Sequence, residues 1–184
     1  MKIPAEAKKV FQGEIFDVYQ WQQKMYDGTY QTFEALRRPL TIQILPTMGD
    51  KILLSYEEQP IKPKAYTFLG GRGEKGEEPL TTAKRELLEE SGLISDDWEL
   101  YKMYESETKI DWQIYLYIAR NCRKVQEQDL DSGEKLEVKK VSFNEFLAHI
   151  CSEDFWGTMI AADIMRKMLT PGKLEEFRKK LFPQ

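Results

Sequence analysis

The stretch 70–93, GGRGEKGEEPLTTAKRELLEESGL, has four glycines in its first seven residues and three glutamates near its end. Its second half predicts a helix over residues 79–91, because Pro79 suits a first helical turn and apolar residues recur at helical spacing from Leu80. Gly92 suits the position that ends a helix. The stretch therefore predicts a glycine-rich loop that leads directly into an amphipathic helix.

The three glutamates of this helix, Glu86, Glu89 and Glu90, fall together beside its apolar stripe. Like charges three and four residues apart destabilise a helix, and partly desolvated carboxylates need a compensating cation. One interpretation is a solvated face paired with Lys84 and Arg85. The other is a site for Mg²⁺ or Mn²⁺, which take all-oxygen ligands and accompany phosphate substrates. The glycine loop before the helix favours the metal interpretation, because a helix N-terminus favours anions.

The spacing of the whole stretch resembles the Nudix box of the Nudix hydrolases. The matching positions are Gly71, five residues, Glu77, seven residues, Arg85-Glu86-Leu87, one residue, Glu89-Glu90, one residue and Gly92-Leu93. The resemblance covers about residues 40–150 and implies an α/β fold, the Nudix-type α/β/α sandwich with a mixed sheet. It also implies metal-dependent hydrolysis of the pyrophosphate bond of a nucleoside diphosphate derivative.

The resemblance implies a role for each residue of the box. The implied metal ligands are Glu86, Glu89, Glu90 and the carbonyl of Gly70, and Glu89 also counts as catalytic. Arg85 is expected to pair with Glu77 and to fix the loop against the helix. A base or further metal ligand is expected from the acidic loop 126–134, where Glu134 is the preferred candidate. The alternative for Glu134 is a solvated loop carboxylate.

Hydrophobic and turn patterns predict the elements around the box. Residues 14–38 predict two strands joined by a type I′ turn at Asp27-Gly28. Further strands are expected at 40–46, 51–59, 65–71, 98–106, 112–120 and 135–143, and further helices around 143–150, 154–169 and 172–181. We expect one domain over 1–184, with an antiparallel β lobe at 1–38 and the catalytic core at 39–184.

The lobe and the box loop resemble the branch of the family that hydrolyses ADP-ribose and nucleotide sugars. That resemblance implies a homodimer through the lobe, with each lobe helping to build the partner's site. The candidate substrate-binding residues are Arg37, Arg38, Arg72, Glu74, Trp21 and Tyr19. The arginines suit phosphate or ribose oxygens, and the two aromatic residues suit stacking of a base. After the second core strand, the branch often has a glutamine followed closely by an arginine for phosphate contact, whereas Gln59 is followed here by Pro60, Ile61 and Lys62.

Composition and charge limit the classes of protein and of site that remain possible. The net charge of −4 argues against a nucleic-acid surface, and the short apolar runs argue against a membrane span. There is one histidine, His149, which excludes a multi-histidine zinc site. Two cysteines and no apolar leader are typical of a cytoplasmic protein with reduced thiols. Two rival functions stay open at this point: hydrolysis of nucleoside triphosphates or dinucleoside polyphosphates, and non-catalytic sensing of a nucleotide sugar.

Overall fold

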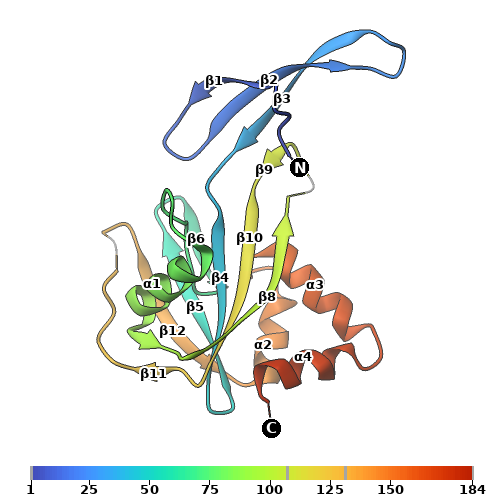
Figure 1. Cartoon of the computed structure of the whole chain (residues 1–184). Coiled ribbons are helices and arrows are strands. Elements are labelled where there is room, and N and C mark those ends of the chain that lie inside the picture. Colours follow the sequence, from blue (N-terminus) through green and yellow to red (C-terminus); the bar gives the residue numbers. More distant parts are fainter. Residues whose placement is uncertain (1, 107, 131, 184) are drawn as a thin grey trace.

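A mixed β-sheet lies at the centre of the computed structural model, which describes residues 2–106, 108–130 and 132–183 (Figure 1). Its strands are β4 (Thr41–Met48), β5 (Lys51–Gln59), β6 (Lys62–Thr67), β8 (Asp97–Glu105), β10 (Gln113–Arg120) and β12 (Lys135–Val141). Their order is β12-β5-β4-β10-β8, and β6 also pairs with β5. β4 runs parallel to β10, whereas the other neighbouring strands run antiparallel.

Helices cover both faces of this sheet (Figure 1). They are α1 (Pro79–Ser91), α2 (Phe143–Ile150), α3 (Thr158–Met168) and α4 (Lys173–Leu181). Ala83 and Leu87 of α1 are buried in one hydrophobic core, and the apolar faces of α2, α3 and α4 are buried in a second core. Two cores on one sheet make the predicted α/β/α sandwich. Among the described residues, no helix is both long and apolar enough to cross a bilayer.

The box helix forms over the predicted residues. Pro79 occupies its first turn, and Gly92 ends it in the left-handed conformation, with its N–H donating to the Leu88 carbonyl at 2.7 Å. The strand before it differs from the prediction of 65–71, because β6 ends at Thr67. Beyond that residue the chain stays extended and adds to β4, where Ile42 N–H donates to the Gly71 carbonyl at 2.8 Å. This pairing places the glycines beside the first half of β4, against which α1 also packs.

The N-terminal lobe is a separate sheet above the core, with the order β1-β2-β3-β9 (Figure 1). Its strands are β1 (Lys8–Gln12), β2 (Asp17–Lys24), β3 (Tyr30–Arg37) and β9 (Ile110–Asp111). β1 was not predicted; all five of its residues are exposed, so it lacks the alternating pattern of a half-buried strand. β9 joins β3 in parallel and comes from the core part of the chain, so the lobe is not wholly antiparallel.

The turn between β2 and β3 is not the predicted type I′ turn. Gly28 N–H donates to the Met25 carbonyl at 3.0 Å, so Tyr26 and Asp27 are the central residues. A type I′ turn needs positive φ at both central residues, and neither has it; Gly28, the next residue, has φ of 87°. The loop is therefore one residue longer than the dipeptide signal suggests.

The segment before α3 is a connector rather than the predicted helical start at residue 154. Asp154 and Trp156 flank Tyr66 of β6: Tyr66 N–H donates to the Asp154 carbonyl at 3.2 Å, and Trp156 N–H donates to the Tyr66 carbonyl at 2.9 Å. Phe155 thereby lies parallel to β6 and packs edge-on against Phe68, with ring centroids 5.1 Å apart. These strand-type bonds use the backbone groups that a helix would need, so α3 begins only at Thr158.

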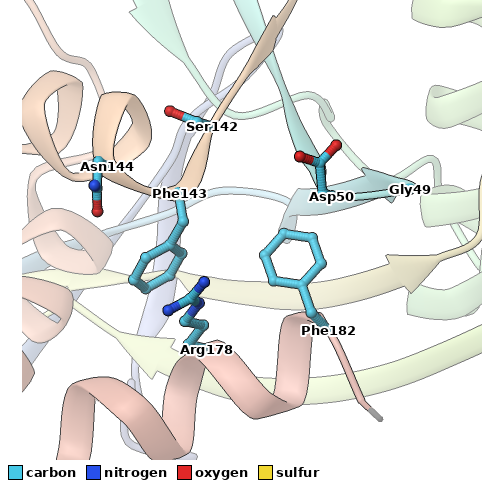
Figure 2. Close-up of a pocket in the computed structure, with 7 residues that line it drawn as sticks. All are labelled: Gly49, Asp50, Ser142, Phe143, Asn144, Arg178 and Phe182. Carbon is cyan, nitrogen blue, oxygen red and sulfur yellow. The ribbon is translucent and has the colours of Figure 1, made fainter.

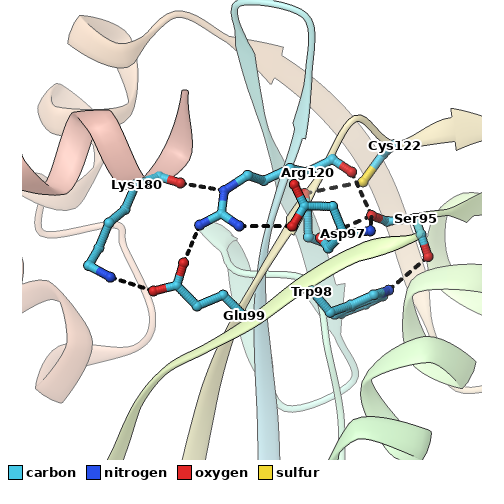
Figure 3. Close-up of polar contacts among 8 residues, drawn as sticks. Ser95, Asp97, Trp98, Glu99, Arg120, Cys122 and Lys180 are labelled. Atoms are coloured by element: carbon cyan, nitrogen blue, oxygen red, sulfur yellow. Dashed lines mark hydrogen bonds and ion pairs between the residues drawn. The ribbon is translucent and has the colours of Figure 1, made fainter. Parts of the chain in front are cut away.

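A buried arginine attaches the last helix to the sheet (Figure 3). Arg120 of β10 is 8% exposed, and it pairs with Asp97 at 3.0 Å and with Glu99, both on β8. Its Nε donates to the Lys180 carbonyl in the last turn of α4, and the Lys180 ammonium pairs with Glu99. The guanidinium thus satisfies a carbonyl at the end of α4 and joins two strands to that helix. Two further short strands, β7 (Leu93–Ile94) and β11 (Arg123–Lys124), pair with each other beside α1.

Candidate active site

Two of the box glutamates are buried behind the glycine loop. Glu86 is 8% exposed and Glu90 is 5% exposed, while Glu89 is only partly buried. The Gly70 N–H donates to Glu90 Oε2 at 2.6 Å. A Cβ on Gly71 would lie 2.5 Å from Glu86 Oε1, so a side chain at this position would displace the carboxylate from its present place. The predicted stripe of glutamates therefore lies at the edge of the buried face of α1.

Arg85 contacts more partners than the predicted one. Its pairing with Glu77 is confirmed and bidentate, with both N–O distances at 3.2 Å. The same guanidinium lies 3.0 Å from Glu86 Oε1 and 2.8 Å from Glu89 Oε2. It also donates to the Arg72 carbonyl at 3.4 Å. Arg85 therefore neutralises part of the glutamate cluster as well as tying the loop to the helix.

The electrostatics of the cluster favour a bound cation. Burial raises the pKa of Glu86 to about 7, against the opposing effect of Arg85. Burial also raises the pKa of Glu90 well above its ordinary value, and nearby Glu86, Glu57 and Glu134 add to the rise. Without a nearby cation these two carboxyl groups therefore favour the neutral form, and a bound cation would offset the cost of their charged form.

Glu134 belongs to this electrostatic cluster. Its charge is among those that raise the pKa of Glu86 and Glu90. The acidic loop before it is attached to the end of α1, because the N–H groups of Val125 and Gln126 donate to the Gly92 carbonyl at 2.9 and 3.3 Å. The structure thus brings the predicted loop carboxylate near the box glutamates, although it leaves that side chain exposed.

A pocket of about 450 Å³ opens in front of Gly70 and Gly71. Such a volume suits a small-molecule site. Three parts of the chain form its walls: the starts of β4 and β10, the strands β5 and β6, and the connector with the first turn of α3. The polar and aromatic residues of the wall are Arg38, Thr41, Gln43, Glu57, Gln59, Lys62, Thr67, Phe68, Arg72, Trp112, Trp156 and Thr158.

The three predicted arginines have different environments. Arg38 and Arg72 line this pocket. Arg38 is half-buried, its guanidinium stacks 4.4 Å from the Trp112 ring, and its Nε has no hydrogen-bond partner among the described residues. Arg37 instead pairs with Asp111 at 2.9 Å, and its guanidinium lies 4.7 Å from the ring of Tyr19. Arg37 is therefore already neutralised, and Arg38 is better placed for an anionic ligand.

The structure does not bring the other predicted substrate contacts into the pocket of the same chain. Tyr19 lies under Arg37 on the lobe, and Trp21 is 9% exposed and packs edge-on against Phe33 at 6.0 Å. Glu74 lines a separate cleft of about 550 Å³ between the lobe and the box loop. Their expected role in the site of a partner chain stays a prediction.

Sequence reasoning missed most of the pocket wall, including Glu57, Trp112 and Trp156. Glu57 lies on β5, and Gln59 donates a hydrogen bond to it. Each of the three is distant in sequence from the box, and the local pattern around each one is an ordinary strand or loop pattern. The motif gives no signal for them, because only the sheet pairing brings them to the same place.

A second pocket, of about 430 Å³, lies at the β4–β5 turn beside α2 and α4 (Figure 2). It is lined by Gly49, Asp50, Ser142, Phe143, Asn144, Arg178 and Phe182. Its walls include none of the predicted site residues, and the glycine loop belongs to the other pocket. The candidate active site is therefore the pocket in front of Gly70.

The donor set of the glutamate cluster fits a divalent ion. Carboxylates and a backbone carbonyl are the oxygen ligands that hard cations such as Mg²⁺ and Mn²⁺ take. As the described side chains stand, no three acidic groups already form a metal-binding group, and Arg85 holds two of the three box glutamates. Each of these two glutamates contacts Arg85 through one carboxylate oxygen, so the second oxygen would remain available to an ion.

The fold and this site define a Nudix hydrolase. The family model of the NUDIX domain matches residues 37–158, which is most of the chain, so the protein belongs to the Nudix family and is a Nudix pyrophosphohydrolase. The sequence is 25% identical over 158 residues to an ADP-ribose pyrophosphatase of Bacillus subtilis strain 168, covering 84% of this chain and 85% of that protein. It is also 25% identical over 149 residues to a methanol dehydrogenase activator of Bacillus methanolicus, covering 79% and 80%.

Solved structures show the same fold. An ADP compounds hydrolase superposes with a TM-score of 0.73 and 20% identity, covering 90% of this chain and 92% of that one. A NUDIX hydrolase from Nitrosomonas europaea superposes with a TM-score of 0.58 and 19% identity, covering 72% and 90%. The first superposition covers nearly all of both chains, so the shared fold extends beyond the box and its sheet.

Proposed function

We propose that the protein hydrolyses the pyrophosphate bond of ADP-ribose or another nucleotide sugar, with Mg²⁺ or Mn²⁺ as the cofactor. The observation that carries the proposal is the pair of buried carboxylates, Glu86 and Glu90, directly behind the glycine edge of a pocket that also contains Arg38. Carboxylates suited to a cation thus lie behind one wall of a pocket that a half-buried arginine also lines. A pyrophosphate needs both kinds of group.

In this proposal the glutamates Glu86, Glu89 and Glu90 would hold the metal together with the Gly70 carbonyl. A bound divalent ion supplies positive charge for the phosphate oxygens and activates water. Glu134 accepts the proton of the attacking water, because its charge already acts on the cluster and its side chain is exposed to solvent. Water adds across the P–O–P bridge, so ADP-ribose yields AMP and ribose 5-phosphate.

Arg38 is the proposed phosphate contact. Burial and the neighbouring Arg72 lower the pKa of Arg38, so the folded protein disfavours its charge in the absence of an anion. Among the described residues no carboxylate pairs with Arg38, and its Nε lacks an acceptor. A phosphate oxygen between Arg38 and Arg72 would supply an acceptor and relieve the repulsion between the two cations.

We also propose that the protein is a cytoplasmic homodimer that associates through the lobe. β1 is exposed along its whole length, and its Val10 and Phe11 are 53% and 60% exposed. Exposed apolar side chains on an edge strand offer a surface to a second chain, although Lys8 and Lys9 of the same strand add charge to it. Within the described part of the lobe, Trp21 and Ala35 are the buried hydrophobic side chains, which is a small core for an independent sheet. Both cysteines are free thiols, in keeping with a reducing compartment.

The test is a hydrolysis screen with Mg²⁺ and with Mn²⁺ over ADP-ribose, other nucleotide sugars, dinucleoside polyphosphates and nucleoside triphosphates. We expect ADP-ribose or a nucleotide sugar to have the highest kcat/KM, with AMP or the corresponding nucleoside monophosphate as a product. Full activity in excess chelator would contradict the metal assignment. A higher kcat/KM for triphosphates or dinucleoside polyphosphates would support the rival hydrolase, and binding without turnover would support the sensor.

A further inference from the structure

Trp156 is held in the wall of the active-site pocket by backbone bonds. The connector that carries it is attached to Tyr66 of β6 on both sides, by the hydrogen bonds of 3.2 and 2.9 Å described above. The same strand continues directly to Gly70 at the glutamate cluster. The position of Trp156 is therefore fixed relative to the metal-binding residues, although about ninety positions separate it from the glycines in sequence.

The neighbours of Trp156 fix its direction. Phe155 is buried in the core against Phe68, whereas Trp156 is only partly buried and lines the pocket. Gly157 has φ of 106°, and a Cβ there would lie 3.1 Å from the Phe68 ring. A glycine is thus needed both for the backbone conformation and for the close approach of the connector to Phe68. The chain turns sharply here into α3 and leaves the indole at the pocket surface.

The rings of the two tryptophans in the pocket wall have different neighbours. Trp112 donates from Nε1 to Thr41 at 3.0 Å, and Arg38 covers its ring at 4.4 Å, so it belongs to the arginine side. Trp156 lies on the side of β6, and the neighbour over its ring is the exposed Lys62, with Nζ 4.7 Å from the centroid. An exposed lysine binds an aromatic ring more weakly than a stacked base does. A planar ligand can therefore displace Lys62 from the indole.

We propose that Trp156 is a specificity-determining residue that stacks the heteroaromatic base of the substrate, while Arg38 and Arg72 hold its phosphates. The inference rests on the proposed function, because it assumes that a nucleotide occupies this pocket. It differs from the expectation drawn from the sequence, which placed base stacking on Tyr19 and Trp21 of the lobe. The expected substrates are therefore diphosphates that carry a flat base, rather than diphosphates linked only to sugars.

The experiment compares Trp156→Phe with Trp156→Leu. Both variants remove the indole and keep an apolar side chain, but only phenylalanine keeps a flat ring. The substrates are ADP-ribose and 5-phosphoribosyl diphosphate, which carries a pyrophosphate and no base. We expect Trp156→Leu to lower kcat/KM for ADP-ribose by about 5- to 100-fold, mainly through KM, and to leave the base-free substrate within about twofold. Trp156→Phe should recover most of the loss.

A binding measurement separates this inference from the proposed function. Calorimetry with AMP and with ribose 5-phosphate needs no turnover, so it decides the role of Trp156 even if the parent protein does not hydrolyse ADP-ribose. We expect Trp156→Leu to weaken AMP binding by the same factor and to leave ribose 5-phosphate unchanged. Equal losses for both ligands would assign Trp156 to the sugar and overturn the inference. Unchanged AMP binding, or no AMP binding by the parent, would also overturn it.

Tyr19→Ala is the rival variant in both assays. If it, rather than Trp156→Leu, removes the advantage of the ligand that carries a base, the base lies on the lobe and the inference is wrong. Melting temperatures of all three variants show whether each one folds. If Trp156→Leu melts far below the parent, Trp156→Phe is compared with the parent instead. Phenylalanine keeps a flat ring, so a Trp156→Phe variant that loses the preference for AMP over ribose 5-phosphate would overturn the inference.

Discussion

Glu90 is the most buried of the three box glutamates, at 5% exposed, and accepts a hydrogen bond from Gly70. Burial and its acidic neighbours raise its pKa, so its ionised form destabilises the metal-free folded protein at neutral pH. Glu90→Gln removes the charge and keeps the acceptor. We expect weaker Mn²⁺ binding, a rate lowered by roughly 100- to 10,000-fold, and a metal-free protein that melts at or above the parent temperature.

The control for this substitution is Glu78→Gln, at the exposed position just before α1, where the side chain makes no capping hydrogen bond. It should leave Mn²⁺ affinity and rate unchanged. Glu134→Gln should lower the rate with little effect on Mn²⁺ affinity or melting. Titration of Mn²⁺ into each variant checks these expectations. If Glu134→Gln loses the metal while Glu90→Gln retains it, the two roles are exchanged.

Arg85 is a single cation shared by three carboxylates. It pairs with Glu77 of the loop and with two box glutamates, so Arg85→Ala leaves three carboxylates without their cation. Removal of one partner of a partly buried pair costs about 3 kcal/mol, and we expect a loss of unfolding free energy of that order. The urea midpoint of the metal-free protein measures it. Lys84→Ala, an exposed neighbour on the same helix, is the control and should be nearly neutral.

Divalent metal ions should change the stability of the Arg85→Ala variant. Divalent ions should restore part of the stability of Arg85→Ala, because they neutralise the same carboxylates. A variant that unfolds like the parent but has lost its activity would show that Arg85 contacts the substrate instead.

At the scale of elements, α3 is attached to the sheet by a buried carboxylate. Asp163 is 8% exposed and pairs with Lys102 of β8 at 2.6 Å and with Lys167 at 2.5 Å. Burial alone would raise the pKa of Asp163, but the two ammonium groups outweigh it and hold the pKa below 3.8. The ionised form therefore stabilises the folded state above pH 4, and that contribution is lost as the pH falls through the lowered pKa.

Asp163→Asn tests this attachment through its pH dependence. We expect a loss of about 2 kcal/mol at pH 7, because Lys102, Lys167 and Tyr104 lose a charged partner, and a smaller difference from the parent near pH 3. Unfolding by urea at both pH values measures it. Asp96→Asn breaks an exposed pair with Arg123 and should change stability by less than about 0.5 kcal/mol at either pH. A loss that is independent of pH would mean that packing, not charge, is responsible.

Local signals account for the elements that the sequence predicts well. The bounds of α1 follow from Pro79, the apolar spacing and Gly92, which all act within one helix. The box glutamates and the Arg85–Glu77 pair follow from the same stretch. The start of α3 at Thr158, in contrast, is set by bonds to Tyr66, and β1 is defined by its pairing with β2. Trp112 and Trp156 reach the pocket only through such long-range pairing, so no nearby residue signals them.

For the molecule as a whole, the proposed association of two chains through the lobe can be tested with one substitution. If β1 forms the interface of a homodimer, Phe11→Asp places a charge in an apolar contact and should give a monomer at micromolar concentration. Sedimentation velocity measures the state. Leu169→Asp is the matched control, because Leu169 is 86% exposed and lies after α3, away from the lobe. A parent protein that sediments as a monomer, or a Phe11→Asp variant that remains a dimer, would contradict the proposal.

The attachment of α4 through Arg120 has a consequence for synthesis in the cell. A ribosome makes the chain from the N-terminus, so β8 and β10 emerge long before α4. Until Lys180 has left the exit tunnel, the Arg120 Nε lacks the carbonyl to which it donates, and the core lacks Phe177 and Leu181, each 1% exposed in the folded state. The core on this face of the sheet is therefore completed only after translation of α4, and nascent chains that stall before this point should be targets for chaperones and proteases.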